Sequence, residues 1–257
     1  MNLDAPVRLA FQSDDGFGSR ARIGMVVLAT DQTLEVEARL VEVEGVAYYH
    51  ARIPNDSEVT VETLTAMEAR LPVAAGLLPA HWDFDVIGYG CTSASTLIGE
   101  QRVTEALQTA HPGVPCTTPI TAAVAAFEAL GIDRIAVVTP YSATVTAPVV
   151  EHFGKAGILV TAVGSFLEEE DFAVARVTEA SVAAGVRTMV EAADCDGVFV
   201  SCTSLRTFGI IDELETELGI PVVSSNLALN WHLLRICGVR DNAGPGRLFS
   251  TDLARNS

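Results

Sequence analysis

Two copies of the tripeptide Cys-Thr-Ser occupy matching places in the two halves of this 257-residue chain. One copy begins at Cys91 and the other at Cys202, 111 positions apart. Each copy ends an aliphatic run, DVIGYG before the first and GVFVS before the second. The runs that open the two halves, at Arg22 and Arg134, are separated by nearly the same interval. This recurrence in the same order indicates an internal duplication.

Paired thiols predict a particular kind of chemistry. If Cys91 and Cys202 face each other across one small substrate, one thiol can remove a proton from a carbon while the other delivers a proton to its opposite face. The same pair suits thiolate addition to a double bond, with the second thiol as the proton donor. A helix beginning after each cysteine would lower the pKa of its thiol and bind a carboxylate. We therefore predict that Cys91 and Cys202 are catalytic. The neighbouring hydroxyl residues predicted to bind the substrate are Thr92, Ser93, Thr203 and Ser204.

The elements that must position these residues alternate regularly between strand and helix patterns. The predicted strands span residues 22–29, 46–53, 84–90, 134–140, 158–166, 196–202 and 221–225. The predicted helices span residues 33–43, 60–78, 96–110, 118–131, 144–157, 175–193, 208–219 and 226–238. This order predicts βαβ units and parallel sheets, with ligands bound at the carboxyl ends of the strands.

The fold class that follows is α/β, with two pseudo-symmetric lobes that each hold a parallel sheet flanked by helices. We place the first lobe at residues 20–115 and the second at 116–240, with a chain crossover between the lobes expected near their ends. Each cysteine would then end a strand at the cleft between the lobes.

Composition limits the possible partners. Hydrophobic residues make up 49% of the chain and charged residues 19%, which permits a large core. The net charge of −17 disfavours a nucleic-acid partner, because phosphate contacts need basic patches. No run of about 18 apolar residues is present, so no membrane span is expected. Residues 1–20 are interpreted as a polar arm without an apolar signal core.

The remaining cysteines are Cys116, Cys195 and Cys237. The five cysteines are odd in number and widely spaced, which argues against a disulfide framework or a zinc site and favours a cytoplasmic location. An isolated cysteine is usually a small buried apolar residue, and we keep that interpretation for these three.

The motifs GYGCTSAS, SCTSLRT and TPY resemble those of the Asp/Glu racemase superfamily, and most closely those of maleate cis-trans isomerases and the related ectoine-utilisation protein. The resemblance extends from about residue 20 to residue 240. It implies a two-lobed isomerase, either a cis-trans isomerase or a racemase, that acts on a small carboxylate. It also implies an enzyme without metal, pyridoxal phosphate or nucleotide, and a homo-oligomer.

The same resemblance implies roles for single residues. Cys91 would add to an alkene carbon, and Cys202 would handle the proton at the neighbouring carbon. Tyr141, in TPY, matches a substrate-binding tyrosine of the isomerases. The simpler alternative is a tyrosine at a strand end with its hydroxyl in water.

Asp31 departs from the isomerase pattern. It stands where those enzymes carry an asparagine that binds a substrate carboxylate. An aspartate there would repel a dicarboxylate by about 1–4 kcal/mol at 4 Å. Asp31 is therefore predicted to contact the substrate, to act as a base for Cys91 or to pair with an amino group. The alternative is that it caps the helix that begins near Thr33.

Other polar residues remain open. A second departure from the isomerases lies near Phe172, where they tend to carry an asparagine. The acidic run at 168–171 is predicted to be a solvated loop. Arg206 either neutralises a carboxylate or forms a surface ion pair, and Asn226 either contacts the cleft or caps a helix.

Several functions fit this pattern. The leading hypothesis is a cofactor-independent isomerase acting next to a carboxylate, maleate isomerase-like or linked to ectoine breakdown. An amino-acid racemase is the first alternative. An arylmalonate-type decarboxylase needs mainly the second cysteine, so Cys91 argues against it. A non-catalytic small-ligand binding protein with two α/β lobes is the last alternative.

Overall fold

The computed structural model describes residues 6–79 and 82–254. Two separate four-stranded sheets, all parallel, confirm the predicted fold class. The first sheet has the order β2-β1-β3-β4, with β1 Ala21–Leu28, β2 Val46–Ile53, β3 Val86–Gly90 and β4 Cys116–Thr117. The second has the order β6-β5-β7-β8, with β5 Arg134–Thr139, β6 Leu159–Ser165, β7 Gly197–Val200 and β8 Val222–Ser224.

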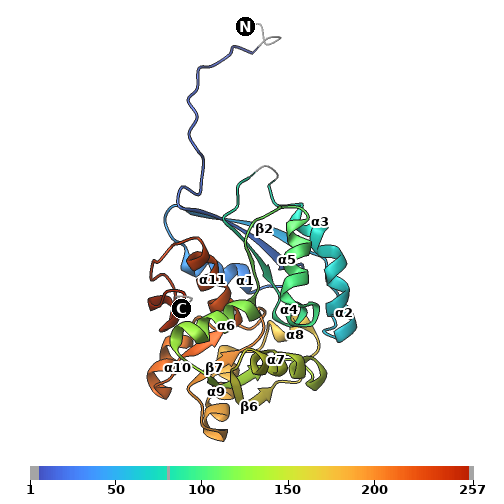
Figure 1. Ribbon diagram of the computed structural model, residues 1–257, viewed down its shortest axis with the longest axis vertical. Helices are drawn as coiled ribbons and strands as arrows, with labels where there is room; N and C mark the ends of the chain where they lie inside the picture. The colour runs from blue at the N-terminus through green and yellow to red at the C-terminus, as the bar shows by residue number, and fades with distance from the viewer. Residues whose placement is uncertain (1–5, 80–81, 255–257) are drawn as a thin grey trace.

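The two sheets are equivalent in topology. In each, the first strand of the lobe lies beside the second and third, and a short fourth strand completes the edge. Because the third strand of each sheet precedes a cysteine motif, the duplication places both motifs at equivalent positions. Figure 1 shows the two lobes one above the other, with the sheets in separate halves of the molecule.

Helices and 3₁₀ turns flank both sheets. Those that precede β5 in the chain are α1 Leu34–Ala38, η1 Arg39–Val41, α2 Val61–Ala66, η2 Met67–Arg70, α3 Leu71–Ala75, α4 Thr92–Ile98, α5 Glu100–Gln108 and α6 Pro119–Leu130. Those that follow β5 are α7 Ala143–Lys155, α8 Asp171–Val174, α9 Glu179–Ala192, α10 Ile211–Leu218, α11 Ser225–Ile236 and η3 Leu248–Ser250.

Three predicted helices are interrupted. The helix predicted at 33–43 continues after α1 only as a 3₁₀ turn. The helix predicted at 60–78 divides into α2, η2 and α3, and Pro72 stands in the first turn of α3, where its missing N–H is not needed. The helix predicted at 96–110 begins at Thr92 and breaks at Gly99, whose φ of +94° is left-handed. β4 and α8 were not predicted.

The lobes share their core. α11 follows β8 of the second sheet, yet it packs against α6 and contacts β3 of the first sheet. One cluster of buried apolar residues joins Val26 to Val198, and the other joins Ile23 to Phe199. Each cluster therefore spans both lobes. The lobe limits 20–115 and 116–240 stay a prediction. β4 lies just beyond the first limit, yet it pairs with β3 of the first sheet.

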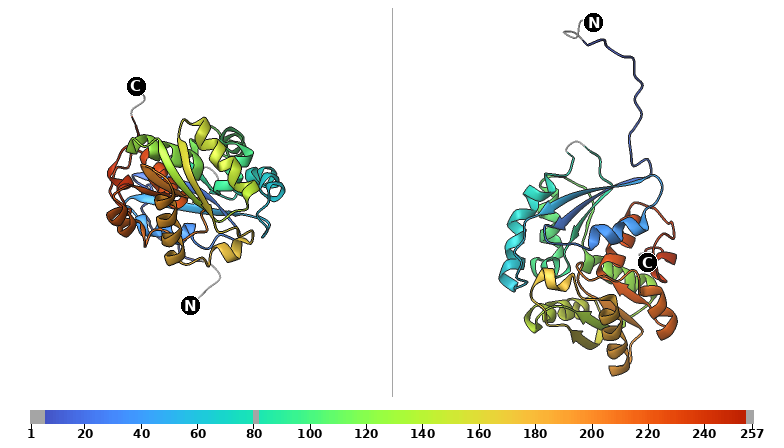
Figure 2. Two further views of the ribbon diagram at one scale, coloured as in Figure 1. Left: turned by 90° about the horizontal axis from the view of Figure 1, so that it is seen from below. Right: turned by 180° about the vertical axis from the view of Figure 1, so that it is seen from behind.

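The amino-terminal arm lies apart from the body. Residues 6–19 form neither helix nor strand, and Figures 1 and 2 show them extending away from the first sheet. Residues 1–5 of the predicted arm lie outside the described residues. No helix in the part of the chain that the structure covers is both long and apolar enough to cross a membrane.

Candidate functional site

Cys91 lies where β3 ends and α4 begins. It is the N-cap of α4, with an extended φ of −149°, and its side chain is 4% exposed. Gly90 precedes it, and a Cβ at that position would overlap the side chain of Leu34 on α1. A larger residue before Cys91 would therefore force Leu34 to move.

Cys202 has a different local setting. β7 ends at Val200, residues 203–205 form a turn, and the next helix begins only at Ile211. The helix predicted at 208–219 is present, but it begins at Ile211 and its N-terminus does not adjoin Cys202. Cys202 has a φ of +110°, a region that non-glycine residues rarely occupy. The surrounding contacts must hold this loop in place.

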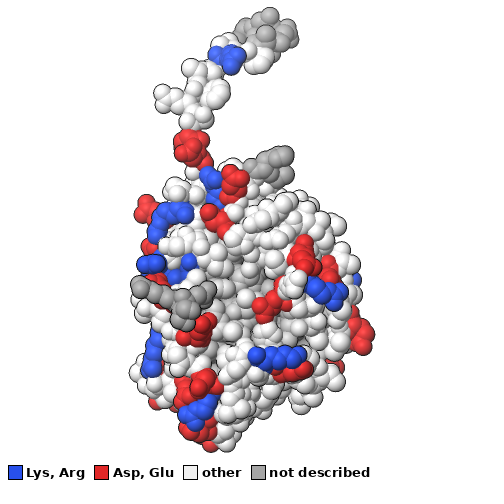
Figure 3. Space-filling model, in the orientation of Figure 1, with Lys and Arg blue, Asp and Glu red and all other residues white. Residues whose placement is uncertain are grey.

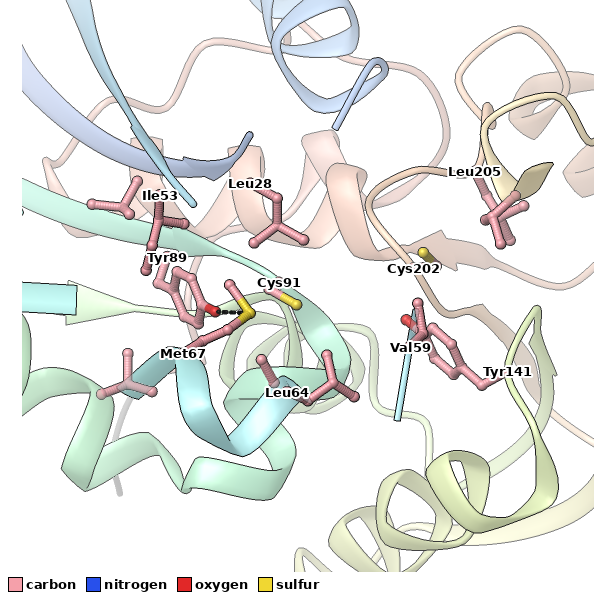
Figure 4. Close-up of a cluster of buried hydrophobic side chains, with 14 of the residues drawn as sticks. Leu28, Ile53, Val59, Leu64, Met67, Tyr89, Cys91, Tyr141, Cys202 and Leu205 are labelled. Atoms are coloured by element: carbon pink, nitrogen blue, oxygen red, sulfur yellow. Dashed lines mark hydrogen bonds between the residues drawn. The ribbon is translucent and has the colours of Figure 1, made fainter. Parts of the chain in front are cut away.

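Both thiols line one small cavity between the lobes. The space open to the centre of a water-sized sphere is about 30 Å³. Seven of the eight residues predicted for the site line it: Cys91, Thr92, Ser93, Tyr141, Cys202, Thr203 and Ser204. Asp31 is the exception. Figure 4 shows both sulfurs in the region between the lobes, with Tyr141 on the side of Cys202.

Hydrogen bonds connect the two cysteine motifs. The hydroxyl of Ser225 accepts from Thr92 Oγ1 at 2.8 Å and from the backbone N–H of Cys202 at 3.0 Å. The hydroxyl of Thr203 donates to the carbonyl oxygen of Gly90 at 3.4 Å. Ser225 begins α11, the helix that packs between the lobes. The fold thus fixes each motif relative to the other.

Burial dominates the acidity of both thiols. It raises the pKa of Cys91 to about 11, although the Ala94 N–H and the Ser93 hydroxyl partly offset it. Burial also raises the pKa of Cys202, opposed by the Tyr141 hydroxyl and the Ser204 N–H. The N–H groups after each cysteine lower the thiol pKa as expected, but burial outweighs them and the net pKa is raised. Both groups are neutral thiols near pH 7.

Tyr141 is buried beside Cys202. Its side chain is 2% exposed, so the alternative of a hydroxyl in water is wrong. Burial holds the pKa of Tyr141 well above its usual value, with the nearby thiols adding to the shift. Its hydroxyl therefore keeps its proton and can donate a hydrogen bond into the cavity.

Asp31 lies close to Cys91 without lining the cavity. Its Oδ1 accepts from the N–H groups of Thr33 and Leu34, both at 2.8 Å, so this oxygen binds the start of α1, although the N-cap residue of that helix is Thr33. Its Oδ2 is buried and has no hydrogen-bond partner within the described part of the chain. Burial raises the pKa of Asp31 to about 6, and its charge in turn raises the pKa of Cys91.

Asp171 is a site residue that the sequence did not reveal. It lines the cavity and is 5% exposed, so the prediction that the run 168–171 is wholly solvated is wrong at its last residue. Its carboxylate accepts from the hydroxyls of Thr30 and, at 2.9 Å, Ser204. The neighbouring Phe172 is half exposed instead. Asp171, and not Phe172, is therefore the residue of this segment that faces the cavity.

A segment of the first lobe closes the cavity. We call residues 57–67 the closing segment. The N–H of Val59 donates to Glu169 O at 2.9 Å, and the N–H of Asp171 donates to Ser57 O at 3.1 Å. These bonds attach the segment to the second lobe beside α8. Its apolar side chains Val59, Leu64 and Met67 line the cavity, as does Leu28; Figure 4 shows Leu28 and Leu64 on opposite sides of Cys91 and Val59 beside Tyr141.

The cavity has no basic side chain among the described residues that line it. Arg206 donates to the carbonyl oxygen of Val177 and is exposed, so it does not face the cavity. On the face shown in Figure 3, Lys and Arg lie beside Asp and Glu and form no basic patch. Within residues 6–79 and 82–254, no group of three or more His, Cys, Asp or Glu side chains is arranged to hold a metal ion.

Two equivalent α/β lobes, with a thiol from each in one cavity, define the Asp/Glu racemase-like superfamily. Comparison with known proteins supports this assignment. A model of the arylmalonate decarboxylase family matches residues 55–249, and the chain belongs to this family. The arylmalonate decarboxylase of Bordetella bronchiseptica is 38% identical over 140 residues, which cover 53% of this chain and 58% of that enzyme. The aligned part thus spans little more than half of that relative's length.

Maleate isomerases match a larger part of the chain. The enzyme of Pseudomonas putida is 27% identical over 248 residues, covering 89% of this chain and 97% of the enzyme. A crystal structure of a maleate isomerase variant from this species with maleate has a TM-score of 0.78 at 25% identity, over 90% of this chain and 97% of that one. A liganded variant of arylmalonate decarboxylase has a TM-score of 0.80 at 30% identity, over 89% of this chain and 98% of that one.

Proposed function

We propose that this chain is a cofactor-independent isomerase that moves a proton or a double bond at a carbon next to a carboxylate, with Cys91 and Cys202 as its catalytic pair. The observation that most supports this proposal is that the two duplicated thiols line one cavity. A reaction at two faces of one carbon needs a group on each side of it, and two thiols from two lobes meet that need.

The neutral state of both thiols makes a base necessary. Cys91, with a pKa of about 11, must lose its proton before it attacks a carbon or removes a proton from one. Asp31 is the base we propose, because its Oδ2 is unpartnered and its pKa of about 6 leaves it ionised at pH 7. Tyr141 and the Ser204 N–H would stabilise the thiolate of Cys202.

A single substrate carboxylate fits the polar part of the cavity. The Ser93 hydroxyl can donate to it without a basic residue. The hydroxyls of Thr92, Thr203 and Ser204 also line the cavity, but each would first have to release its present acceptor. The crystal structure of a relative with maleate supports a small carboxylate as the substrate. A second substrate carboxylate would meet the charges of Asp31 and Asp171, which disfavours maleate itself. The apolar wall at Leu28 suits an uncharged substituent on the reacting carbon.

Decarboxylation is the second candidate, and the family match favours it. The apolar wall also suits the uncharged side of a disubstituted malonate. Decarboxylation needs one thiol to protonate the carbanion, whereas isomerisation uses both. The presence of Cys91 is why we rank isomerisation first. Racemisation of an amino acid remains the alternative if Asp31 or Asp171 pairs with the substrate ammonium group.

A substrate panel in heavy water distinguishes these reactions. Proton NMR would follow maleate, both enantiomers of a 2-arylpropionate, aspartate, and an arylmalonate. We expect turnover by isomerisation or racemisation, with deuterium entering the carbon next to the carboxylate. Decarboxylation of the malonate with no isomerisation of any other compound would overturn the first proposal in favour of the second.

The variant Asp31→Asn tests the role proposed for Asp31. If Asp31 is the base for Cys91 or pairs with an ammonium group, turnover of the true substrate should fall by about 10²–10⁴-fold. If Asp31 instead only repels a second carboxylate, maleate turnover should rise in the variant, because one negative charge is removed. Efficient conversion of maleate by the unchanged protein would contradict the argument from charge repulsion.

A further inference from the structure

The structure assigns Glu37 as a positioning residue for Cys202. This inference goes beyond the proposed reaction and depends on it only for the role of that thiol. Glu37 lies on α1 of the first lobe and is 5% exposed. Its carboxylate is directed into the loop that follows Cys202 in the second lobe.

Three N–H donors hold this carboxylate. Oε1 accepts from the backbone N–H of Thr207 at 2.6 Å and of Phe208 at 2.9 Å. Oε2 accepts from Nδ2 of Asn226 at 2.6 Å. Charge-assisted hydrogen bonds to buried carboxylates are among the stronger interactions in proteins. Glu37 therefore fixes the far end of the Cys202 loop to the first lobe.

Asn226 carries this restraint to the residue beside the thiol. Its Nδ2 uses one proton for Glu37 and the other for the carbonyl oxygen of Thr203, at 2.9 Å. Its Oδ1 is buried and has no partner in the described part of the chain. Asn226 lies in α11, just after the N-cap Ser224, so it does not cap that helix. It links Glu37 to the carbonyl group of Thr203, the residue that follows Cys202.

The conformation of Cys202 explains why such a restraint is needed. Its φ of +110° is strained for a residue with a side chain, and no helix begins directly after it. Strained backbone persists only where surrounding contacts fix it. A bond from Ser225 holds the Cys202 N–H, and the Glu37–Asn226 pair holds the following residues. These bonds therefore fix the position of Cys202 relative to the first lobe.

Glu37→Gln tests this assignment. The amide can keep an acceptor toward Thr207 and Phe208, but its NH₂ then faces the NH₂ of Asn226. If Asn226 turns its amide over to accept that bond, the carbonyl of Thr203 loses its donor. We expect kcat to fall by 10-fold or more, because small misplacements of reacting groups have large effects on rate. We also expect the ratio of Cys202 to Cys91 alkylation by iodoacetamide, read by mass spectrometry, to change at least threefold.

Glu215→Gln is the matched control. Glu215 is equally buried and also accepts two backbone N–H groups, from Val222 and Arg247, away from the cavity. It should lower the melting temperature without changing the alkylation ratio. If Glu37→Gln behaves like this control, Glu37 is only structural and the assignment is wrong. The alkylation ratio needs no turnover, so this result is independent of the proposed reaction.

A second variant covers the case in which Glu37→Gln does not fold. Asn226→Ala removes the link while leaving the carboxylate its two backbone donors. It should change the alkylation ratio in the same direction. The double variant should be no worse in kcat than the worse single one, since both act through one contact. Additive effects, or an unchanged ratio in Asn226→Ala, would overturn the assignment.

Discussion

Single residues decide what this cavity can do, and two carboxylates matter as much as the two thiols. Asp31 and Asp171 both raise the pKa of Cys91 by their charge. In a cavity without basic side chains among its described lining, each added negative charge is costly. The residues therefore favour a substrate with one carboxylate over one with two.

Asp31 should also leave a trace in the pH dependence of stability. Burial raises its pKa from 3.8 to about 6 in the folded protein, so the folded state binds its proton more tightly than the unfolded chain does. The stabilisation from this proton is complete below pH 3.8 and is lost as pH rises through 6. In Asp31→Asn this loss is absent. Between those pH values the variant should gain up to about 3 kcal/mol in unfolding free energy relative to the wild type.

Urea unfolding at a series of pH values would measure this gain. Asp196→Asn is the control, because Arg134 lowers the pKa of that carboxyl and its linkage has the opposite sign. A flat difference between wild type and Asp31→Asn across pH 4–6.5 would show that Asp31 is not buried as described.

At the scale of elements, the stability of helix α2 determines how well the closing segment is held over the cavity. Thr60 caps α2 with a reciprocal pair of bonds: its Oγ1 accepts from the Thr63 N–H, and its own N–H donates to Thr63 Oγ1. α2 contributes Thr63 and Leu64 to the cavity. The cap thus supports the wall that covers the thiols, and Figure 1 shows α2 beside α4 and α8 where the lobes meet.

Thr60→Ala should therefore affect substrate binding. Loss of an N-cap usually costs about 1 kcal/mol, and if that loss favours the open segment, KM should rise up to about fivefold. Thr178→Ala removes an equivalent cap from α9, which contributes no residue to the cavity. Steady-state kinetics should show an unchanged KM for Thr178→Ala. Equal KM values for both variants would contradict a closing role for α2.

The elements also show what sequence patterns could predict. β2 was predicted with its observed limits, and both cysteine motifs were found because they are duplicated. Sequence patterns did not reveal Asp171 and Glu37, and one reason explains both. Each stands in an acidic stretch typical of a solvated surface, and each has a hydrogen-bond partner in the opposite lobe: Thr30 for Asp171 and Asn226 for Glu37. Local periodicity contains no information about such contacts.

At the scale of the whole molecule, the duplicated lobes impose symmetry on the topology and leave the two thiols different. Cys91 begins a helix, while Cys202 lies in a strained loop beside Tyr141. Opposed groups in unlike settings suit a reaction in which one thiol removes a proton or attacks while the other donates. The cytoplasmic location, the ectoine link and the homo-oligomer remain predictions.

The most direct test of the central claim compares three variants, each with one cysteine replaced by alanine, on the substrate that the panel identifies. Deuterium entry and product formation are followed by NMR. We predict that Cys91→Ala and Cys202→Ala each reduce turnover by at least 10²–10⁴-fold, the usual contribution of a positioned acid or base. Both should keep the melting temperature within a few degrees of the wild type. Cys195→Ala should match the wild type, because Cys195 lies outside the cavity. Undiminished turnover in Cys91→Ala, with only Cys202→Ala inactive, would contradict the two-thiol account and favour a one-thiol reaction such as decarboxylation.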